Sequence, residues 1–306
     1  MDSLNLVARR QAEWSVTANR LKAAVDRARW ATFGLSILGA ILATVASQLQ
    51  EGDERKYVAV AGAVVLSVAT FINLRFGSAE RAANWAKARA ASEALKREAF
   101  KFAAGAAPYD VPATAEDVFK AETGKIEAGV DALTNELVRS SKAGSAPAAP
   151  ISHDQYVKQR VRGQIDDFYN PKSDRFRVLA SRLRGLEVFF ALLATVITAV
   201  VGVLKKYPVT NFSFDLAALT SVLTTIGATI LAHIQASRYD FLVTSYRATA
   251  RRLEQSLLDF KEPPTLSPPA WSTFVERCES IIAFENQSWV AKWSGPDRPP
   301  VPQASA

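Results

Sequence analysis

The chain has 306 residues, which is enough for one or two domains, and its formal net charge is +7. Apolar residues make up an ordinary 49% of it, and the single cysteine, Cys278, excludes an intramolecular disulfide. The apolar residues are unevenly distributed, because four stretches hold most of the aliphatic content. These stretches, rather than the totals, indicate the class of protein.

The first predicted element is a helix that begins near Leu4 and enters the first apolar stretch without a break. Apolar and small side chains recur at steps of three and four, and no proline or glycine precedes Gly34. The charged first 29 residues lack the pattern of a signal peptide. We therefore expect the first apolar stretch to act as an internal signal-anchor.

Four apolar spans are predicted, at about 30–49, 57–76, 186–204 and 214–235. Each is close to the ~20 residues that a helix needs to cross the hydrocarbon core of a bilayer. The alternative is that they are core helices of a soluble protein, but the chain lacks the large soluble shell that four such helices need. The sequence therefore predicts an all-α integral membrane protein with four transmembrane helices in two tandem helical hairpins.

Each predicted hairpin is followed by a helix with a seven-residue rhythm, and the two rhythms have the same steps. This duplication indicates two similar units. We expect each unit to be a long antiparallel helical pair whose cytoplasmic extensions form a coiled-coil-like bundle. The matching positions are Trp85, Ala88, Ser92, Leu95, Ala99 and Phe102 after the first hairpin, and Val243, Tyr246, Ala250, Leu253, Leu257 and Phe260 after the second.

A separate segment lies between the units. Residues 114–117 resemble a capping box, and a weaker amphipathic helix follows as far as Leu137. A helix over 156–169 opens the second unit, and Asn170-Pro171 is expected to break it. The predicted domains are a first unit at 1–139, a Ser/Ala/Pro-rich linker at 140–150, a second unit at 151–293 and a disordered tail at 294–306.

Lysine and arginine lie mainly on one side of the predicted membrane. They cluster before the first and third spans and after the second and fourth, whereas the hairpin turns hold only Arg55, Lys56, Lys205 and Lys206. By the positive-inside rule, both termini are cytoplasmic. The basic flanks also explain the net charge as attraction to an anionic leaflet. Since no nucleic-acid-binding motif accompanies the charge, we expect no nucleic-acid partner.

Residues that could carry catalysis are sparse. His153 and His233 have no second histidine or cysteine at metal-ligand spacing. Cys278 lies on an apolar stripe and has no histidine near it in the sequence. Gly124-Lys125 is not a phosphate-binding loop, because the glycine spacing and the preceding strand are absent. We therefore expect no enzyme activity, no metal and no cofactor.

Hydroxyl side chains form rows in the third and fourth spans. In an oligomer such rows could line a water-filled path. The alternative is that each hydroxyl bonds back to a carbonyl of its own helix, as is common in membranes. Asn73 and His233, at the cytoplasmic ends of their spans, could contact water or a gate, or simply reach the interface. The candidate pore-lining residues are Thr195, Thr198, Thr220, Ser221, Thr224 and Thr225.

Two carboxylates, Glu279 and Glu285, lie on or near the apolar face of the last predicted helix. A carboxylate on a buried face needs an arginine, because an unpaired buried charge is costly. We predict a structural ion network in which these carboxylates pair with arginines before the third span and after the fourth. The candidate arginines are Arg182, Arg184, Arg251 and Arg252.

Three segments of the second unit, together with its apolar hairpin, resemble the bacterial SLATT family of two-span membrane domains. They are YVKQRVRGQIDDFYNP at 156–171, SYRATARRLEQSLLDF at 245–260 and FVERCESIIAFENQSW at 274–289. The first unit resembles a divergent SLATT subtype through Trp14, its hairpin and NWAKARAASEALKREAFKF at 84–102, but it lacks a counterpart of the final Glu-rich helix.

The resemblance implies an effector of a nucleotide-signal-linked conflict or defence system in the bacterial inner membrane. Such an effector would oligomerise and permeabilise the membrane when a nucleotide-sensing or nucleotide-producing protein partner is triggered. The leading hypothesis is therefore an oligomeric pore-forming or ion-conducting protein, with the lipid bilayer and further copies of the chain as partners. The alternative is a non-conducting membrane scaffold whose cytoplasmic bundle docks a soluble partner. The pore hypothesis predicts that leucine in place of Ser221 or Thr224 abolishes activity without loss of folding, whereas the scaffold hypothesis predicts that leucine is tolerated.

Overall fold

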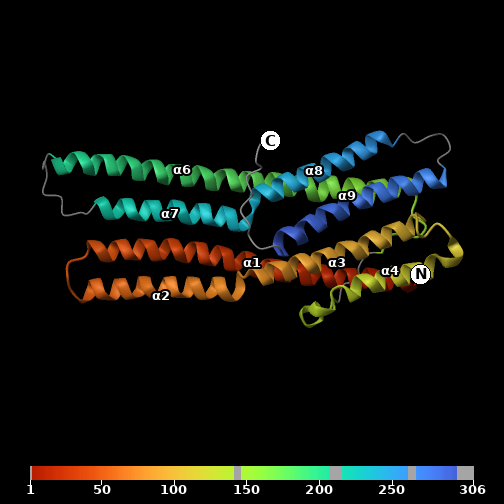
Figure 1. The fold of residues 1–306 in the computed structure, drawn as a ribbon, viewed down its shortest axis with the longest axis horizontal. Helices are drawn as coiled ribbons and strands as arrows, with labels where there is room; N and C mark the ends of the chain where they lie inside the picture. Colours follow the sequence, from red (N-terminus) through yellow and green to blue (C-terminus); the bar gives the residue numbers. More distant parts are fainter. Residues whose placement is uncertain (1, 141–145, 207–215, 261–266, 295–306) are drawn as a thin grey trace, which may run out of the picture. The chain divides into compact units, whose positions relative to one another are not determined.

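The structure is a computed structural model that is helical almost throughout (Figure 1). Helices make up 89% of the described part of the chain, and no strand occurs there. The all-α fold class is confirmed. The described residues are 2–140, 146–206, 216–260 and 267–294, so the second hairpin turn, part of the predicted linker and the tail after Ser294 lie outside them.

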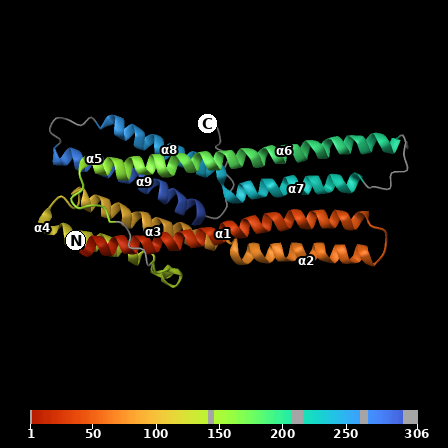
Figure 2. The same ribbon diagram turned by 180° about the vertical axis from the view of Figure 1, so that it is seen from behind.

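The helices follow one another in the predicted order (Figures 1 and 2). The first predicted repeat contains α1 (Asp2–Gln48), α2 (Asp53–Phe76), α3 (Ala79–Ala103), α4 (Pro112–Ala128) and a short 3₁₀-helix, η1 (Asp131–Glu136). The second contains α5 (His153–Tyr156), the π-helices η2 (Val157–Arg162) and η3 (Ile165–Tyr169), α6 (Asn170–Lys206), α7 (Leu216–Ser237), α8 (Tyr239–Asp259) and α9 (Pro268–Ser294).

The chain packs as two compact units that cut across the two predicted sequence repeats. The bundle unit comprises Met1–Ala23, Ala79–Ser173 and Thr244–Ala306, and the membrane unit comprises Ala24–Ser78 and Asp174–Val243. Each unit therefore takes helices from both repeats. The predicted domain boundaries at 1–139 and 151–293 stay a prediction.

The membrane unit contains the four apolar spans. The most apolar windows of these helices have mean hydropathies of 1.6 to 2.4, and the protein itself buries only 6% to 39% of each window. Large side chains such as Phe71, Leu74 and Leu192 are more than half exposed. Contiguous apolar surface of this extent needs lipid rather than water around it. The soluble-core alternative is therefore excluded, and the chain is an all-α membrane protein.

Small residues bring α1 and α2 close together in the first hairpin. A Cβ atom added at Gly39 would lie 2.5 Å from the side chain of Leu66, and one added at Gly62 would lie 3.4 Å from Leu42 Cβ. Glycine at such a position lets two helix backbones approach in lipid, where packing replaces the hydrophobic effect as the cause of helix association.

The helix that leads into the third span does not break at Asn170-Pro171, so that prediction is wrong. Asn170 has α-helical backbone angles, φ −63° and ψ −51°, and an uninterrupted helix runs from His153 to Val203. A proline inside a regular α-helix removes one hydrogen bond and clashes with the carbonyl four residues earlier. The wider turns of η3 directly before Pro171 accommodate that missing donor.

The core of the bundle unit joins the two repeats. Helix α3 packs along α9 and against α4. Its predicted stripe is buried at Trp85, Leu95 and Ala99. The beginning of α1 joins it through a reciprocal pair, since Gln11 Nε2 donates to Ser92 Oγ at 3.0 Å and Ser92 Oγ donates to the Gln11 carbonyl at 3.1 Å. The returning helix thus has its own hairpin partner, as predicted, and a second partner from the other repeat.

Candidate functional site

The membrane unit has a groove between α6 and α7 with a volume of about 660 Å³. It is lined on both sides by small residues, so that the two helices leave a continuous hollow between them. Four of the six candidate pore-lining hydroxyl residues line it: Thr195, Thr198, Thr220 and Thr224. The other two, Ser221 and Thr225, do not line the groove. The structure thus separates the two predicted rows of the fourth span into one groove row and one row outside it.

Every candidate hydroxyl donates its proton to the carbonyl four residues earlier in its own helix. The distances are 2.9 Å for Thr195, 2.8 Å for Thr198, 3.3 Å for Thr220 and Ser221, 2.9 Å for Thr224 and 2.8 Å for Thr225. This is the alternative that the sequence left open. It does not exclude a polar wall, because a hydroxyl that has donated still offers its oxygen lone pairs as acceptors. The groove therefore presents hydroxyl acceptors.

Glu187 is the ionisable residue of this groove and was not among the predicted site residues. It is half-buried, and no salt bridge to another described residue joins it. The two helices are close at this level, because a Cβ atom added at Gly227 would lie 3.9 Å from the Glu187 carbonyl oxygen. The sequence does place Glu187 directly before the long charge-free run 188–204. Because it stands at the start of the span, however, it looks like an ordinary flanking charge rather than a residue of a membrane groove.

His233 and Asn73, the two polar residues predicted near the cytoplasmic ends of their spans, have different surroundings. The His233 ring lies 4.4 Å from the Trp30 ring and 4.8 Å from the Phe33 ring, and Tyr239 Oη lies 3.3 Å from His233 Nε2. His233 is buried in this aromatic cluster, which joins α1 to α7 inside the membrane unit. Asn73 is exposed.

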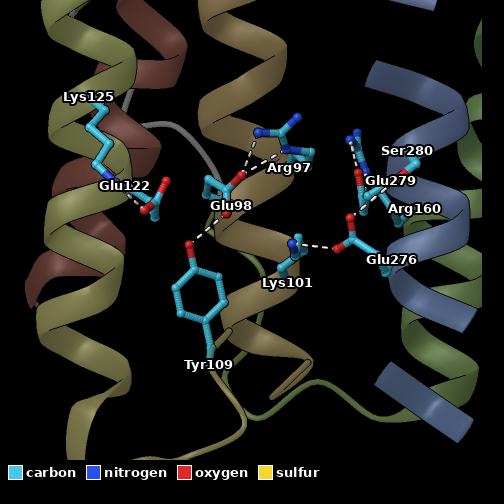
Figure 3. A network of polar contacts seen from close by, with 10 residues as sticks. All are labelled: Arg97, Glu98, Lys101, Tyr109, Glu122, Lys125, Arg160, Glu276, Glu279 and Ser280. Atoms are coloured by element: carbon cyan, nitrogen blue, oxygen red, sulfur yellow. Dashed lines mark hydrogen bonds and ion pairs between the residues drawn. The ribbon is translucent and has the colours of Figure 1, made fainter. Parts of the chain in front are cut away.

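The centre of the bundle unit contains a fully buried ion pair between Arg160 and Glu279 (Figure 3). Arg160 Nε donates to Glu279 Oε1 at 2.9 Å and Nη2 donates to Oε2 at 2.7 Å, which is the two-bond geometry that suits a guanidinium and a carboxylate. Tyr156 Oη donates to the same Oε1 at 3.0 Å. Both charged side chains are 0% exposed, so water contributes nothing to their solvation.

The second predicted carboxylate, Glu285, has a much poorer partner. Arg89 Nη2 lies 3.9 Å from Glu285 Oε2, and neither carboxylate oxygen has a hydrogen-bond partner in the described chain. The Arg89 guanidinium instead lies between two aromatic rings, 4.9 Å from the ring centres of Phe168 and Trp289. The arginine is therefore stabilised partly by cation–π contacts and leaves Glu285 incompletely compensated.

The four arginines expected to pair with these carboxylates have other surroundings. The partner of Glu279 is Arg160 and that of Glu285 is Arg89, because these two side chains face α9 inside the bundle core. Arg184 pairs with Asp240 in the membrane unit, Arg252 lies 5.6 Å from the Phe284 ring centre, and Arg182 and Arg251 are exposed. The expected pairing is thus corrected.

We expect the stability of the bundle to fall as the pH rises, because of Glu285. Burial raises the pKa of this carboxyl from 4.5 to about 7, and the nearby Arg89 opposes the shift only in part. A carboxyl with a raised pKa stabilises the fold in its protonated form, so its contribution is full below pH 4.5 and is lost as the pH rises through about 7. The loss is about 3 kcal/mol, since one pKa unit corresponds to about 1.4 kcal/mol.

Chemical unfolding of the wild type and Glu285→Gln at about pH 5 and about pH 8 measures this difference. The glutamine variant is expected to lose most of the pH dependence, whereas a control change at the exposed Glu254, Glu254→Gln, keeps it. An equal slope in wild type and Glu285→Gln would show that another group titrates.

Further polar contacts tie α3 to its neighbours (Figure 3). Lys101 Nζ lies 2.5 Å from Glu276 Oε2 on α9, and Tyr109 Oη donates to Glu98 Oε2 at 2.6 Å. In the described chain, no group of three or more side chains could hold a metal ion. The bundle unit thus contains buried charge, and the membrane unit contains a polar groove.

Together these features define a helical membrane protein with two transmembrane hairpins and a charge-containing helical bundle. Residues 156–289 match the family described as "SMODS and SLOG-associating 2TM effector domain 1". This part of the chain, which contains α6 to α8 and most of α9, is similar to the SLATT family of two-transmembrane domains. Residues 12–117 match a different family, described as a protein of unknown function (DUF4231). No curated protein and no solved structure matches the chain.

Proposed function

We propose that this protein is an oligomeric, ion-conducting effector of the bacterial inner membrane. The observation that carries the proposal is the groove between α6 and α7, where four threonines and one carboxylate lie within a surface that is otherwise apolar. Polar side chains within membrane-spanning helices are costly, and they generally face a protein interior or a water-filled path rather than lipid. A groove that lies open on a single chain acquires such a path when several copies surround it.

The groove favours cations. The four threonine protons are already donated to helix carbonyls, so the hydroxyl oxygens face the groove as acceptors. Glu187 adds a carboxylate to the same wall. Rings of oxygen acceptors and acidic side chains are the chemistry from which cation-conducting pores are built. Four spans in one chain are too few to enclose a wide pore, so conduction needs several copies.

The family and the charge distribution support the remaining parts of the proposal. The SLATT match names a two-transmembrane effector domain that associates with SMODS and SLOG proteins. We infer that a nucleotide-sensing or nucleotide-producing partner triggers opening through the bundle unit. Basic residues at the bundle ends of the spans support a cytoplasmic bundle and cytoplasmic termini. Nothing in the proposal requires catalysis, a metal or a cofactor.

Ion flux from liposomes that contain the purified full chain tests the proposal. Thr224→Leu fills the groove and removes one acceptor, and it is expected to lower cation flux at least about tenfold, since it adds a barrier of about 1.4 kcal/mol or more. Thr225→Leu is the matched control, because it makes the same chemical change one residue away and outside the groove. It is expected to leave the flux unchanged.

Two results would overturn the proposal. Equal loss in both variants, with the helical content intact, would mean that the groove is not the path. No flux from the wild type, even when its bundle unit is loosened by Glu279→Leu, would favour the non-conducting scaffold. In that case Thr224→Leu should be tolerated in every assay.

A further inference from the structure

Several aromatic rings in the bundle unit form a cluster against which cations lie. The Trp85 and Trp289 rings meet edge to face with their centres 5.1 Å apart, and the Trp289 and Tyr246 rings stack at 5.7 Å. The Phe168 ring meets Tyr246 edge to face at 5.6 Å. We call these four residues, Trp85, Phe168, Tyr246 and Trp289, the ring cluster. They come from α3, η3, α8 and α9, so the cluster joins four elements of the bundle unit.

Three cations lie against the faces of the ring cluster. Lys172 Nζ lies 4.0 Å from the centre of the Phe168 ring, and Lys22 Nζ lies 5.1 Å from the centre of the Trp85 ring. The Arg89 guanidinium lies between two rings of the cluster, 4.9 Å from each centre. A ring face attracts a cation but carries no net charge. The rings therefore hold these cations close together without neutralising them.

The carboxylates around these cations do not balance their charge. Glu285 lies 3.9 Å from Arg89, and burial raises its pKa to about 7, so at neutral pH it carries only about half a negative charge. Burial also opposes ionisation of Glu93, but Lys96 and Arg160 hold its pKa below the ordinary value. The negative charge of Glu93 is therefore shared with cations outside the ring cluster.

Lys172 shows the resulting excess of positive charge. Burial of its ammonium, and then the positive charges of Arg89 and Lys22, lower its pKa from 10.5 to about 8, and the neighbouring carboxylates oppose this shift less. A lysine that loses its proton this readily lies where too little negative charge favours its ionised form. An anion bound beside it would restore that balance.

The two lysines can be reached from outside the protein. Lys172 is exposed and Lys22 is half-buried, whereas the Arg89 side chain is only 15% exposed. Among the described residues, no carboxylate forms a salt bridge with Lys172. An incoming anion can therefore contact the two ammonium groups directly, while Arg89 attracts it from within the ring cluster.

We propose that Lys172 and Lys22 bind the phosphate group of a phosphate monoester beside the ring cluster. Such a group carries a charge of about −1.5 to −2 at pH 7 and offers three acceptor oxygens, so it can serve two ammonium groups at once. A carboxylate or a chloride ion supplies only a single charge. The ester is either a soluble molecule or a lipid headgroup, because both present the same three oxygens. The site does not depend on ion conduction, since all of its residues belong to the bundle unit.

Competitive acetylation of the full chain in phosphatidylcholine nanodiscs tests this site. Trace acetic anhydride reacts only with uncharged amines, and mass spectrometry of the peptides gives the rate at each lysine. At about pH 7, glycerol 3-phosphate is expected to slow the acetylation of Lys172 about tenfold or more, because a bound dianion raises the pKa of a lysine by about one unit or more. Lys158, an exposed lysine on η2, is the internal control and should not change. Sodium chloride at the same ionic strength is the control for screening.

Two variants locate the binding. Lys22→Gln removes one of the two ammonium groups, so glycerol 3-phosphate is expected to bind at least about tenfold more weakly, as read from the concentration that halves the acetylation rate of Lys172. Lys158→Gln makes the same chemical change outside the ring cluster and should bind the ester as the wild type does. Circular dichroism confirms that each variant retains its helices.

Nanodiscs that contain phosphatidic acid distinguish the two sources of the phosphate group. If phosphatidic acid slows the acetylation of Lys172 without added ester, the site binds a lipid headgroup. If only glycerol 3-phosphate slows it, the site binds a soluble ester. The inference is overturned if neither slows it, or if sodium chloride slows it as much. It is also overturned if Lys22→Gln binds glycerol 3-phosphate as tightly as the wild type.

Discussion

Replacing Glu279 by leucine is expected to lower the free energy of unfolding of the bundle unit by about 3–5 kcal/mol, which is a large part of the stability of a typical domain. The change leaves Arg160 fully buried without its two-bond partner, and it leaves the Tyr156 hydroxyl without its acceptor. Neither side chain can reach water, because both are fully buried. Chemical unfolding of the purified chain, followed by tryptophan fluorescence, measures the loss.

A double variant distinguishes the cost of an orphaned charge from the value of the pair itself. Arg160→Met together with Glu279→Leu removes both charges, and it is expected to recover most of the stability that either single change loses. Arg277→Ala breaks an exposed pair with Asp259, which is 2.8 Å long, and it should leave the free energy of unfolding nearly unchanged, because water screens such pairs. If the double variant is as unstable as the single ones, the attraction within the pair must exceed the cost of burying its two charges, so that the pair itself stabilises the bundle.

The sequence predicted the membrane-spanning part of the fold well, because each span is defined by a local property. About 20 consecutive apolar residues with basic flanks suffice to identify a transmembrane helix. The amphipathic stripe of α3 is equally local, and Trp85, Leu95 and Ala99 are buried as their spacing predicts. These patterns do not show which helix packs against the stripe. Helix α3 packs along α9 of the other predicted repeat as well as against its own hairpin.

The charged core could not be predicted in the same way. The spacing on α9 shows that Glu279 is buried, but Arg160 lies 119 positions away in the sequence and on a π-helical segment whose face does not follow the usual period. The predicted arginine partners lie before the third span and after the fourth, outside the 156–169 segment that contains Arg160. A buried arginine on an irregular helix leaves no periodic pattern by which to recognise it.

The exact residue at which a helix begins was also predicted incorrectly in one case. The capping box predicted at 114–117 is absent, since α4 begins at Pro112 and no side chain caps it. A proline at the first position of a helix needs no donor of its own and fixes the backbone, so it determined the start. A true capping box occurs instead at Ser152, where its hydroxyl accepts from the Gln155 amide at 3.3 Å and the Gln155 side chain accepts from the Ser152 amide at 3.2 Å.

Changing the charge of Glu187 is expected to change which ions cross the membrane, if the groove between α6 and α7 is the path. An ion about 4 Å from a carboxylate gains about 1 kcal/mol even at the dielectric constant of water, and more in a narrow pore. Glu187→Gln should therefore lower the ratio of cation to anion permeability about fivefold or more, and Glu187→Lys should reverse the preference. Reversal potentials across a planar bilayer under a salt gradient measure both.

This experiment distinguishes a wrong assignment of the ion path from an absence of conduction. Glu254→Gln removes a carboxylate of the same size from an exposed position on α8 and is expected to leave the reversal potential of the wild type unchanged. A conducting Glu187→Lys variant with the selectivity of the wild type would place the path away from α6 and α7, although the protein would still be a pore. Absence of current from the wild type under the same conditions would count against conduction itself. Glu187 and Thr224 line the same groove. If the Glu187 variants change the ion selectivity and Thr224→Leu lowers the flux, both residues therefore lie on one common path.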